Sequence, residues 1–171
     1  MKPTRRSTVL VFLVILGITS CMQEQPTKQY YDESPEIEIA KKVIDAFEQG
    51  DLKAYRSLFS DTAKLWHNES YVLNPGKTID EQMVMLESYF TSSEYRIYEN
   101  EIWEMIIQDE GANWVHFWAD FRTKLNGDET EVKNVIHLAF SIYDNKVVYE
   151  AGIWDNLPFF LAQQRLEMIE E

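Results

Sequence analysis

Residues 113–154 read NWVHFWADFRTKLNGDETEVKNVIHLAFSIYDNKVVYEAGIW, and this stretch carries the strongest structural signal in the chain. Long runs of aromatic and β-branched residues are separated by the turn-forming sequences Asn126-Gly127-Asp128 and Asp144-Asn145. This pattern predicts antiparallel strands joined by hairpins. We therefore expect strands over residues 113–125, 131–143 and 147–154, preceded by another over residues 95–108.

The part of the chain before these strands predicts helices. Ser34-Pro35 is a typical helix start, and apolar residues at helical spacing continue to Phe47, before Gly50. Asp51 predicts a second helix start, and Thr78 with Glu81 has the spacing of a capping box for a third helix. A short strand over residues 63–68 and a last helix from Pro158 complete the expected elements.

Three helices followed by long antiparallel strands predict the α+β class. Strands longer than ten residues must curl strongly. We expect about four long strands and a short one to form an antiparallel sheet wrapped around three N-terminal helices. The domain over residues 35–171 would then be a cone with an interior pocket.

The N-terminal residues have the features of a bacterial lipoprotein signal peptide. A basic start is followed by an apolar run from Val9 to Ile18, which is too short to span a bilayer. Ile18-Thr19-Ser20-Cys21 resembles a lipobox, which implies a leader over residues 1–20 and acylation of Cys21. An ordinary signal peptide with an incidental cysteine is the alternative. Residues 21–34 are polar and predict a flexible tether.

Composition and charge exclude some classes of function. The net charge is −13, and the leader carries three positive charges and no acid, so the mature chain would carry −16. A surface this acidic repels phosphate backbones, and we therefore expect no binding of nucleic acid. With one cysteine there can be no internal disulfide. We expect the acylated Cys21 to attach the domain to a membrane of the cell envelope, outside the cytoplasm. Met22 is not an aspartate, which favours the outer membrane where one exists.

The order of elements and five short sequences together resemble one superfamily. These sequences are FEQGDL (47–52), LFSD (58–61), LWHN (65–68), LNG (125–127) and GIWD (152–155). They resemble the nuclear transport factor 2-like superfamily, which includes SnoaL-like polyketide cyclases and ketosteroid isomerase. When this chain is aligned with the isomerases, the positions of their two oxyanion donors correspond to Val43 and His137. The position of their general base falls near Asn68. Valine and a neutral amide cannot perform this chemistry, so the resemblance implies that steroid isomerisation is absent.

The resemblance also implies which residues face the pocket. His137 is the strongest candidate for a functional side chain, and Asp155 could pair with it as a second catalytic group. A structural role for His137, and a capping role for Asp155, are the alternatives. The full predicted pocket lining is Trp66, His67, Asn68, Phe117, Phe121, His137, Trp154 and Asp155.

The other face of the strand over residues 113–125 predicts an interface. Trp114, His116 and Trp118 alternate with the face that contains Phe117, and tryptophan is enriched at interfaces. A homodimer through this outer face is therefore expected. The three histidines, His67, His116 and His137, lack metal-ligand spacing, so we expect neither a metal nor another cofactor.

Functions from three classes remain open at this point. One, a subunit of an envelope complex, would show a filled cone and a large apolar outer face, and the other two use the pocket. The first is a lipid-anchored domain that binds a small apolar or amphipathic ligand, or a protein partner, without catalysis. The second is an enzyme, namely a lyase, isomerase or hydratase of the polyketide-cyclase type that uses His137 with Asp155. Open space between poised His137 and Asp155 side chains would favour the enzyme.

Overall fold

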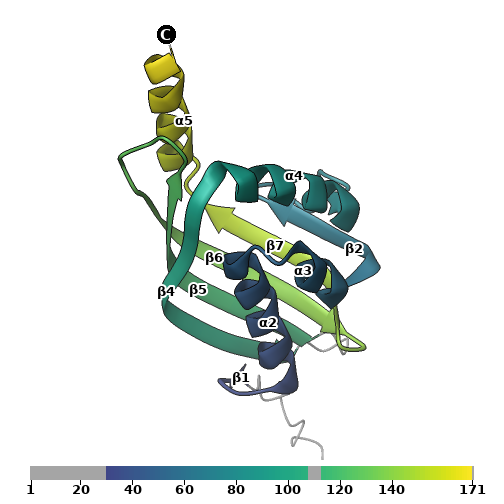
Figure 1. Ribbon diagram of the computed structural model, residues 1–171. Helices are drawn as coiled ribbons and strands as arrows, with labels where there is room; N and C mark the ends of the chain where they lie inside the picture. The colour runs from purple at the N-terminus through teal and green to yellow at the C-terminus, as the bar shows by residue number, and fades with distance from the viewer. Residues whose placement is uncertain (1–29, 108–112, 171) are drawn as a thin grey trace, which may run out of the picture.

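A curved sheet of seven strands, with helices packed on one face, forms the body of the molecule in the computed structural model (Figure 1). The structure describes residues 30–107 and 113–170. The predicted leader, Cys21 and the tether as far as residue 29 lie outside the described residues. The α+β class and the predicted cone fold are confirmed.

The order of elements follows the sequence-based prediction, with two additional strands of two residues each. The helices are α2 (Pro35–Gln49), α3 (Leu52–Leu58), α4 (Ile79–Ser92) and α5 (Leu157–Glu170). The strands are β1 (Tyr30–Tyr31), β2 (Phe59–His67), β3 (Lys77–Thr78), β4 (Ser93–Ile107), β5 (Asn113–Leu125), β6 (Val132–Tyr143) and β7 (Lys146–Trp154).

The predicted helix starts are confirmed by their capping hydrogen bonds. The Ser34 hydroxyl accepts from the backbone N–H of Ile37, and the Asp51 carboxylate accepts from that of Ala54. Thr78 and Glu81 form both halves of the capping box at the start of α4. These side chains accept hydrogen bonds from N–H groups that have no partner within the helix.

The sheet differs from the prediction at its edges. Its order is β1-β4-β5-β6-β7-β2-β3, and β2 pairs with β7 in parallel, whereas the other pairs are antiparallel. Strand β2 has nine residues instead of the short segment expected. Tyr30 and Tyr31, which we expected in the tether, pair with Ile106 and Met105 of β4. These pairings are long-range, so no local pattern in the sequence predicts them.

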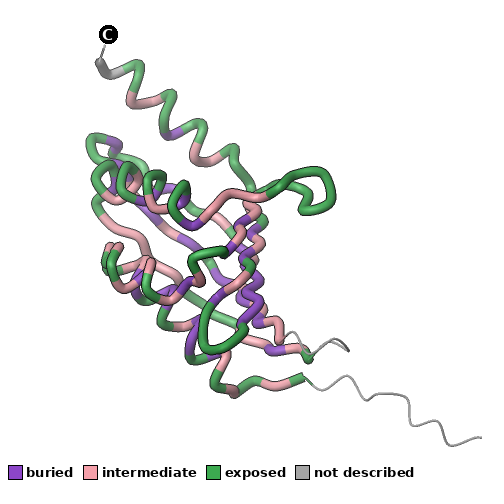
Figure 2. Tube along the Cα trace, turned by 90° about the vertical axis from the view of Figure 1, so that its right-hand side faces the viewer, coloured by how far each residue is buried: buried purple, intermediate pink, exposed green. Residues whose placement is uncertain are grey.

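The main core lies between the helices and the concave face of the sheet. Buried residues concentrate there, as Figure 2 shows. Side chains alternate between the two faces along a strand, and in β6 the buried residues Ile136, Leu138 and Phe140 point to the helix side. A smaller core joins α5 to the end of the sheet, and there the Arg165 guanidinium donates to the buried Asp128 carboxylate at 2.6 Å. In the described part of the chain, no helix has the length and apolar character required to cross a membrane.

Candidate functional site

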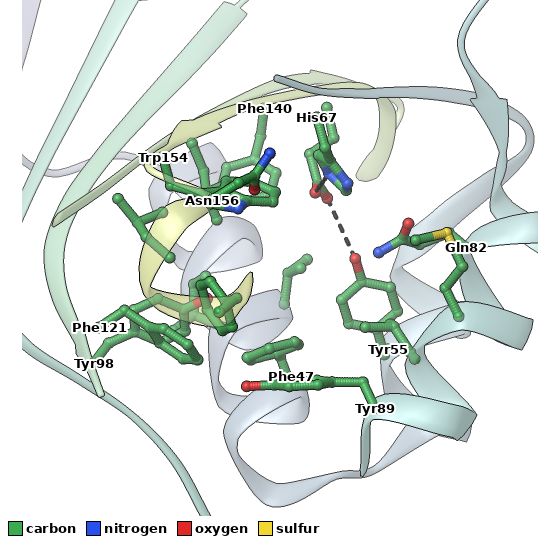
Figure 3. A pocket seen from close by; sticks show the side chains of 18 residues that line it. Phe47, Tyr55, His67, Gln82, Tyr89, Tyr98, Phe121, Phe140, Trp154 and Asn156 are labelled. Carbon is green, nitrogen blue, oxygen red and sulfur yellow. Dashed lines mark hydrogen bonds and ion pairs between the residues drawn. The ribbon is translucent and has the colours of Figure 1, made fainter. Parts of the chain in front are cut away.

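A cavity of about 290 Å³ lies between the sheet and the helices (Figure 3). Its walls are mostly aromatic and aliphatic, with a few polar groups gathered near Tyr55. The lining residues are Val43, Ile44, Phe47, Tyr55, His67, Gln82, Met85, Leu86, Tyr89, Tyr98, Phe121, Ile136, Leu138, Phe140, Glu150, Trp154, Asn156 and Phe159. An apolar pocket with a few convergent polar groups is the usual form of a small-molecule site.

Glu150 is the centre of the polar group. Its side chain is only 5% exposed, and the two carboxylate oxygens have different partners. Oε1 lies 2.7 Å from Nε2 of His67, whose side chain is 10% exposed, and Oε2 accepts from the Tyr55 hydroxyl at 3.3 Å. A carboxylate this deeply buried needs such partners, because an unpaired charge in an apolar environment is costly.

The direction of these hydrogen bonds follows from the chemistry of the groups. In its ionised form the carboxylate only accepts, and Nε2 of His67 is then the donor of this hydrogen bond. Burial raises the pKa of Tyr55 well above its ordinary value, and the charge of Glu150 acts in the same direction. Tyr55 therefore keeps its proton and donates it. In the described residues, no hydrogen bond is formed by Nδ1 of His67.

Strand β7 places Glu150 in the cavity by simple alternation. Residues 150, 152 and 154 share the inward face, where Glu150 and Trp154 flank Gly152. A Cβ atom on Gly152 would lie 2.6 Å from the Trp154 ring, 2.8 Å from Leu138 and 3.1 Å from His67. Glycine at this position therefore lets the indole and the imidazole approach, and their ring centroids lie 5.2 Å apart.

Three of the predicted pocket residues line the cavity, and their role in binding stays a prediction. These are His67, Phe121 and Trp154. Phe117 is on the inward face as expected, but it is fully buried and packs on Trp103 with ring centroids 4.3 Å apart. It supports the wall without lining it.

Trp66 and Asn68 have structural roles outside the cavity. The Trp66 indole donates to the Asn74 carbonyl at 2.9 Å and packs against Gly76. Asn68 has a positive φ of 55° at the end of β2, and its side chain bonds the Trp154 backbone N–H and Asn156. Asn68 thereby fixes the end of β7 next to the cavity.

The predicted inward placement of His137 is wrong. His137 is directly opposite Trp118 in the sheet, so both side chains lie on the same, outer face. Its ring stacks on Trp118 and on His116, and Nε2 lies 3.1 Å from Nδ1 of His116. The prediction placed His137 and Trp118 on opposite faces, and a shift of one residue in register produces this reversal.

Asp155 does not line the cavity either. Its side chain is exposed, and the carboxylate accepts from the backbone N–H of Leu157 at 2.9 Å, at the start of α5. This is the capping role considered as the alternative. No hydrogen bond joins Asp155 to His137 in residues 30–107 and 113–170, so the predicted catalytic pair is not formed.

The outer face contains the aromatic row that we expected there. Trp114, His116 and Trp118 are half-buried on the side of β5 away from the cavity. The His116 and Trp118 rings stack with centroids 5.7 Å apart. Whether another molecule packs on this face stays a prediction.

Six polar residues of the cavity lining were missed from the sequence, namely Tyr55, Gln82, Tyr89, Tyr98, Glu150 and Asn156. One signal for Glu150 was present, because it is the only acid in the apolar strand KVVYEAGIW and lies at even spacing from Trp154. Tyr55 and Gln82 occupy inward positions of α3 and α4, where tyrosine and glutamine look like ordinary helix residues. Within the described residues, no cluster of three or more histidine, cysteine or acidic side chains could hold a metal ion.

Comparison with known proteins supports the fold. No family model matches the chain, and no curated protein is significantly similar to it. The fold resembles that of a nuclear transport factor 2-like protein from Burkholderia xenovorans, with a TM-score of 0.56, 15% identity, and coverage of 75% of this chain and 95% of that one. A putative SnoaL-like polyketide cyclase from Shewanella denitrificans gives 0.59 and 10%, with coverage of 78% and 99%. An epoxide hydrolase from M. tuberculosis gives 0.53 and 12%, with coverage of 77% and 90%.

These structures define the architecture as that of the nuclear transport factor 2-like and SnoaL-like proteins. At such low identity they establish the fold alone. Both ligand-binding and catalytic roles are compatible with it.

Proposed function

We propose that the protein binds a small, largely apolar molecule in the cavity and moves a proton to or from it with the His67–Glu150 pair. The observation that carries this proposal is the buried Glu150 carboxylate, held between the His67 imidazole and the Tyr55 hydroxyl at one end of an otherwise apolar cavity. This pair replaces His137 and Asp155 as the candidate acid–base groups.

The arrangement suits proton transfer for two reasons. Glu150 fixes the imidazole through Nε2, which leaves Nδ1 of His67 to accept or return a proton. The apolar walls exclude much of the water, and electrostatic interactions are stronger in such an environment than in bulk solvent. Tyr55, whose pKa is raised by burial, remains a donor to the carboxylate at neutral pH.

The lining also indicates which ligands fit. It contains no lysine or arginine in the part of the chain that the structure describes, and Glu150 is its one carboxylate. A phosphate or carboxylate group would therefore meet no positive side chain there apart from a protonated His67. We infer a neutral, compact ligand whose body contacts aromatic rings such as Phe121 and Trp154. Two proteins of similar fold are named as a putative polyketide cyclase and an epoxide hydrolase, which is consistent with a small-molecule ligand.

Exchange of carbon-bound hydrogen tests this function without knowledge of the substrate. A panel of small cyclic ketones is incubated with the protein in D₂O, and deuterium incorporation next to the carbonyl is followed by NMR. We expect acceleration for at least one ketone and a loss of about 100-fold or more in Glu150→Gln, which keeps the size of the side chain. Glu129→Gln, on an exposed loop residue, is the matched control and should retain the rate.

Other results of this experiment oppose the proposal. Equal exchange by wild type and Glu150→Gln would remove Glu150 from the chemistry. Tight binding of a ketone with no exchange in the wild type would instead support the non-catalytic binding domain expected from the sequence.

We also propose that Cys21 is acylated and anchors the domain to the outer surface of a bacterial membrane. The support is the Ile18-Thr19-Ser20-Cys21 sequence after an apolar run. Expressed in bacteria, the protein should partition into the detergent phase, and mass spectrometry should find the mature N-terminus at an acylated Cys21. Cys21→Ser should abolish both. An unmodified cysteine in the mature protein would contradict the proposal.

A further inference from the structure

Tyr98 is a cavity residue whose hydroxyl takes no part in holding the fold together. Its ring lies on the wall directly opposite Phe121 in the register of β4 and β5, and the two ring centroids are 4.8 Å apart. Its backbone N–H donates to the Glu48 carboxylate at 2.5 Å. Within residues 30–107 and 113–170, the Tyr98 hydroxyl itself forms no hydrogen bond. Packing of the ring and the backbone contact therefore fix this residue, and the hydroxyl is left over.

The Tyr98 hydroxyl is also within reach of a ligand. In the described chain, the buried side-chain atoms that have neither exposed surface nor a hydrogen-bond partner are Oε1 of Gln82 and Nε of Arg122. The Tyr98 oxygen lacks a partner but is not one of these sealed atoms, so a small molecule in the cavity can touch it. Figure 3 shows Tyr98 beside Phe121, across the cavity from Tyr55.

The other two tyrosines of the lining have no free hydroxyl to offer. The Tyr55 hydroxyl donates to the buried carboxylate, and the Tyr89 hydroxyl donates to Thr123 at 2.9 Å. Burial raises the pKa of Tyr98 well above its ordinary value, and Tyr89 and Glu150 act in the same direction. Tyr98 therefore keeps its proton at neutral pH, and the cavity presents one unused phenol donor among its tyrosines.

We propose that the Tyr98 hydroxyl donates a hydrogen bond to the carbonyl oxygen of the bound ligand, which makes the ligand class a compact cyclic ketone. This inference rests on the proposed function and deepens it, because it names the polar group of the ligand and the residue that meets it. A carbonyl oxygen only accepts, so it matches this donor, and it adds no charge near Glu150.

The contact would assist the proton transfer at the neighbouring carbon. When the His67–Glu150 pair removes a proton from that carbon, the electron pair of the C–H bond forms the carbon–carbon double bond of an enolate. The second pair of the carbonyl bond moves to the oxygen, where the hydrogen bond from Tyr98 stabilises the new charge. Return of a proton or deuteron to the carbon reverses both shifts.

The infrared band of a bound ketone reports this hydrogen bond directly. The probe is 2-tetralone labelled with ¹³C at the carbonyl, added to the whole protein. In the wild type the carbonyl band should lie at a lower wavenumber than in a hydrocarbon solvent, and Tyr98→Phe should lose this shift. Tyr89→Phe also removes a hydroxyl from the lining, but that hydroxyl is already donated to Thr123, so the band should keep its wild-type position.

Two further measurements separate a ligand contact from a structural role. Tyr98→Phe should slow deuterium exchange by about 100-fold in kcat, with a smaller change in KM, as expected when an oxyanion loses one donor. The same substitution should leave the thermal unfolding of the empty protein unchanged, because the hydroxyl has no partner in the fold to lose.

The possible outcomes separate this inference from the proposed function. An unshifted band in the wild type, a wild-type band in Tyr98→Phe, or a less stable Tyr98→Phe protein would overturn the role of Tyr98. Failure of the folded wild type to bind 2-tetralone would overturn the ligand class. A shift that depends on Tyr98 without deuterium exchange in any ketone would support the contact and defeat the proton chemistry. Exchange that depends on Glu150, with a band that ignores Tyr98, would defeat only this inference.

Discussion

At the scale of single residues, Tyr55 links the polar groups of the cavity. It is 3% exposed and donates to the Glu150 carboxylate. Helix α3 holds it in place, and its ring packs on Phe59 with centroids 4.8 Å apart. Because the buried Glu150 carboxylate accepts from this hydroxyl, its removal should affect stability and chemistry together.

Tyr55→Phe should lower the free energy of unfolding by about 1–3 kcal/mol, because it removes a hydrogen-bond donor from the buried Glu150 carboxylate. Urea unfolding measures this difference. Tyr149→Phe is the matched control, since Tyr149 is 45% exposed, and it should change the stability by less than about 0.5 kcal/mol. Equal effects of the two substitutions would mean that the Tyr55 hydroxyl does not hold the polar group together.

Whether a pocket residue was predicted correctly depended on whether its face of the sheet could be inferred from the sequence. The resemblance assigned Phe121 and Trp154 to the pocket, and both line the cavity. His137 was misplaced because its face depends on the register between β5 and β6, where Trp118 is its direct neighbour. Glu150 was overlooked because nothing local shows that His67, 83 residues away in sequence, lies 2.7 Å from it.

At the scale of secondary-structure elements, the contact between β7 and β2 shapes the site. The strands run in parallel, and His67 of β2 pairs with Gly152 of β7. Asn68 reinforces the end of this pairing, because its backbone N–H donates to the Gly152 carbonyl at 2.8 Å. The missing side chain at residue 152 makes room for the His67 and Trp154 rings.

Gly152→Ala should therefore perturb the site from within the sheet. The added methyl group would overlap Trp154 and Leu138, and relieving that overlap should cost about 1–3 kcal/mol of stability. Ile153→Ala, at the neighbouring outward position that is 67% exposed, is the control and should cost less. Thermal unfolding compares the two variants. An unchanged unfolding temperature in Gly152→Ala would mean that Trp154 and Leu138 leave room for the added methyl group.

A second prediction at this scale concerns the start of α4. Thr78→Ala removes one half of the capping box and should destabilise the protein by about 0.5–2 kcal/mol. Denaturant titration measures the change, and Thr130→Ala on an exposed loop is a suitable control. No loss of stability in Thr78→Ala would contradict the capping role.

The elements that the sequence predicted well have local causes. Strand β5 was predicted with its observed bounds, because the apolar pattern ends at a turn in which Gly127 has a φ of 85°. The helix starts were predicted from capping residues for the same reason. Strands β1 and β3 have two residues each and exist only through their partners, so no pattern within them could reveal them.

At the scale of the whole molecule, the outer face of the sheet has an apolar row across four strands. Ile102, Trp118, His137 and Ile153 lie side by side in the register of β4, β5, β6 and β7. Ile102 is 56% exposed and Ile153 is 67% exposed. We expect two copies of the chain to associate through this face, because a twofold axis would place the row against itself.

Ile153→Asp should shift the protein toward the monomer in analytical ultracentrifugation, by at least about tenfold in the dissociation constant, since it places a charge in an apolar contact. Val84→Asp, on an exposed residue of α4, is the control and should leave the dimer intact. A wild-type protein that sediments as a monomer at high concentration would contradict the expectation.

The histidines of this face should make stability depend on pH. Burial lowers the pKa of both His116 and His137, and repulsion from His116 lowers that of His137 further, while Glu104 acts to raise the pKa of His116. Because the unfolded chain binds these protons more readily, their contribution to stability is present above about pH 6.5 and is lost as the pH falls through the lowered values. The variant His116→Gln/His137→Gln should therefore show a weaker loss of stability between pH 7.5 and 5 in urea unfolding. Identical pH profiles would contradict this assignment.

The most direct test of the site is the ¹⁵N NMR signals of the three histidine rings, recorded as a small cyclic ketone that undergoes exchange is added. We predict that the His67 ring nitrogens shift on ligand binding, and that the Nε2 signal changes in Glu150→Gln. The His116 and His137 signals should stay in place. Ligand-induced shifts at His116 and His137 with an unperturbed His67 would contradict the placement of the functional site in the cavity.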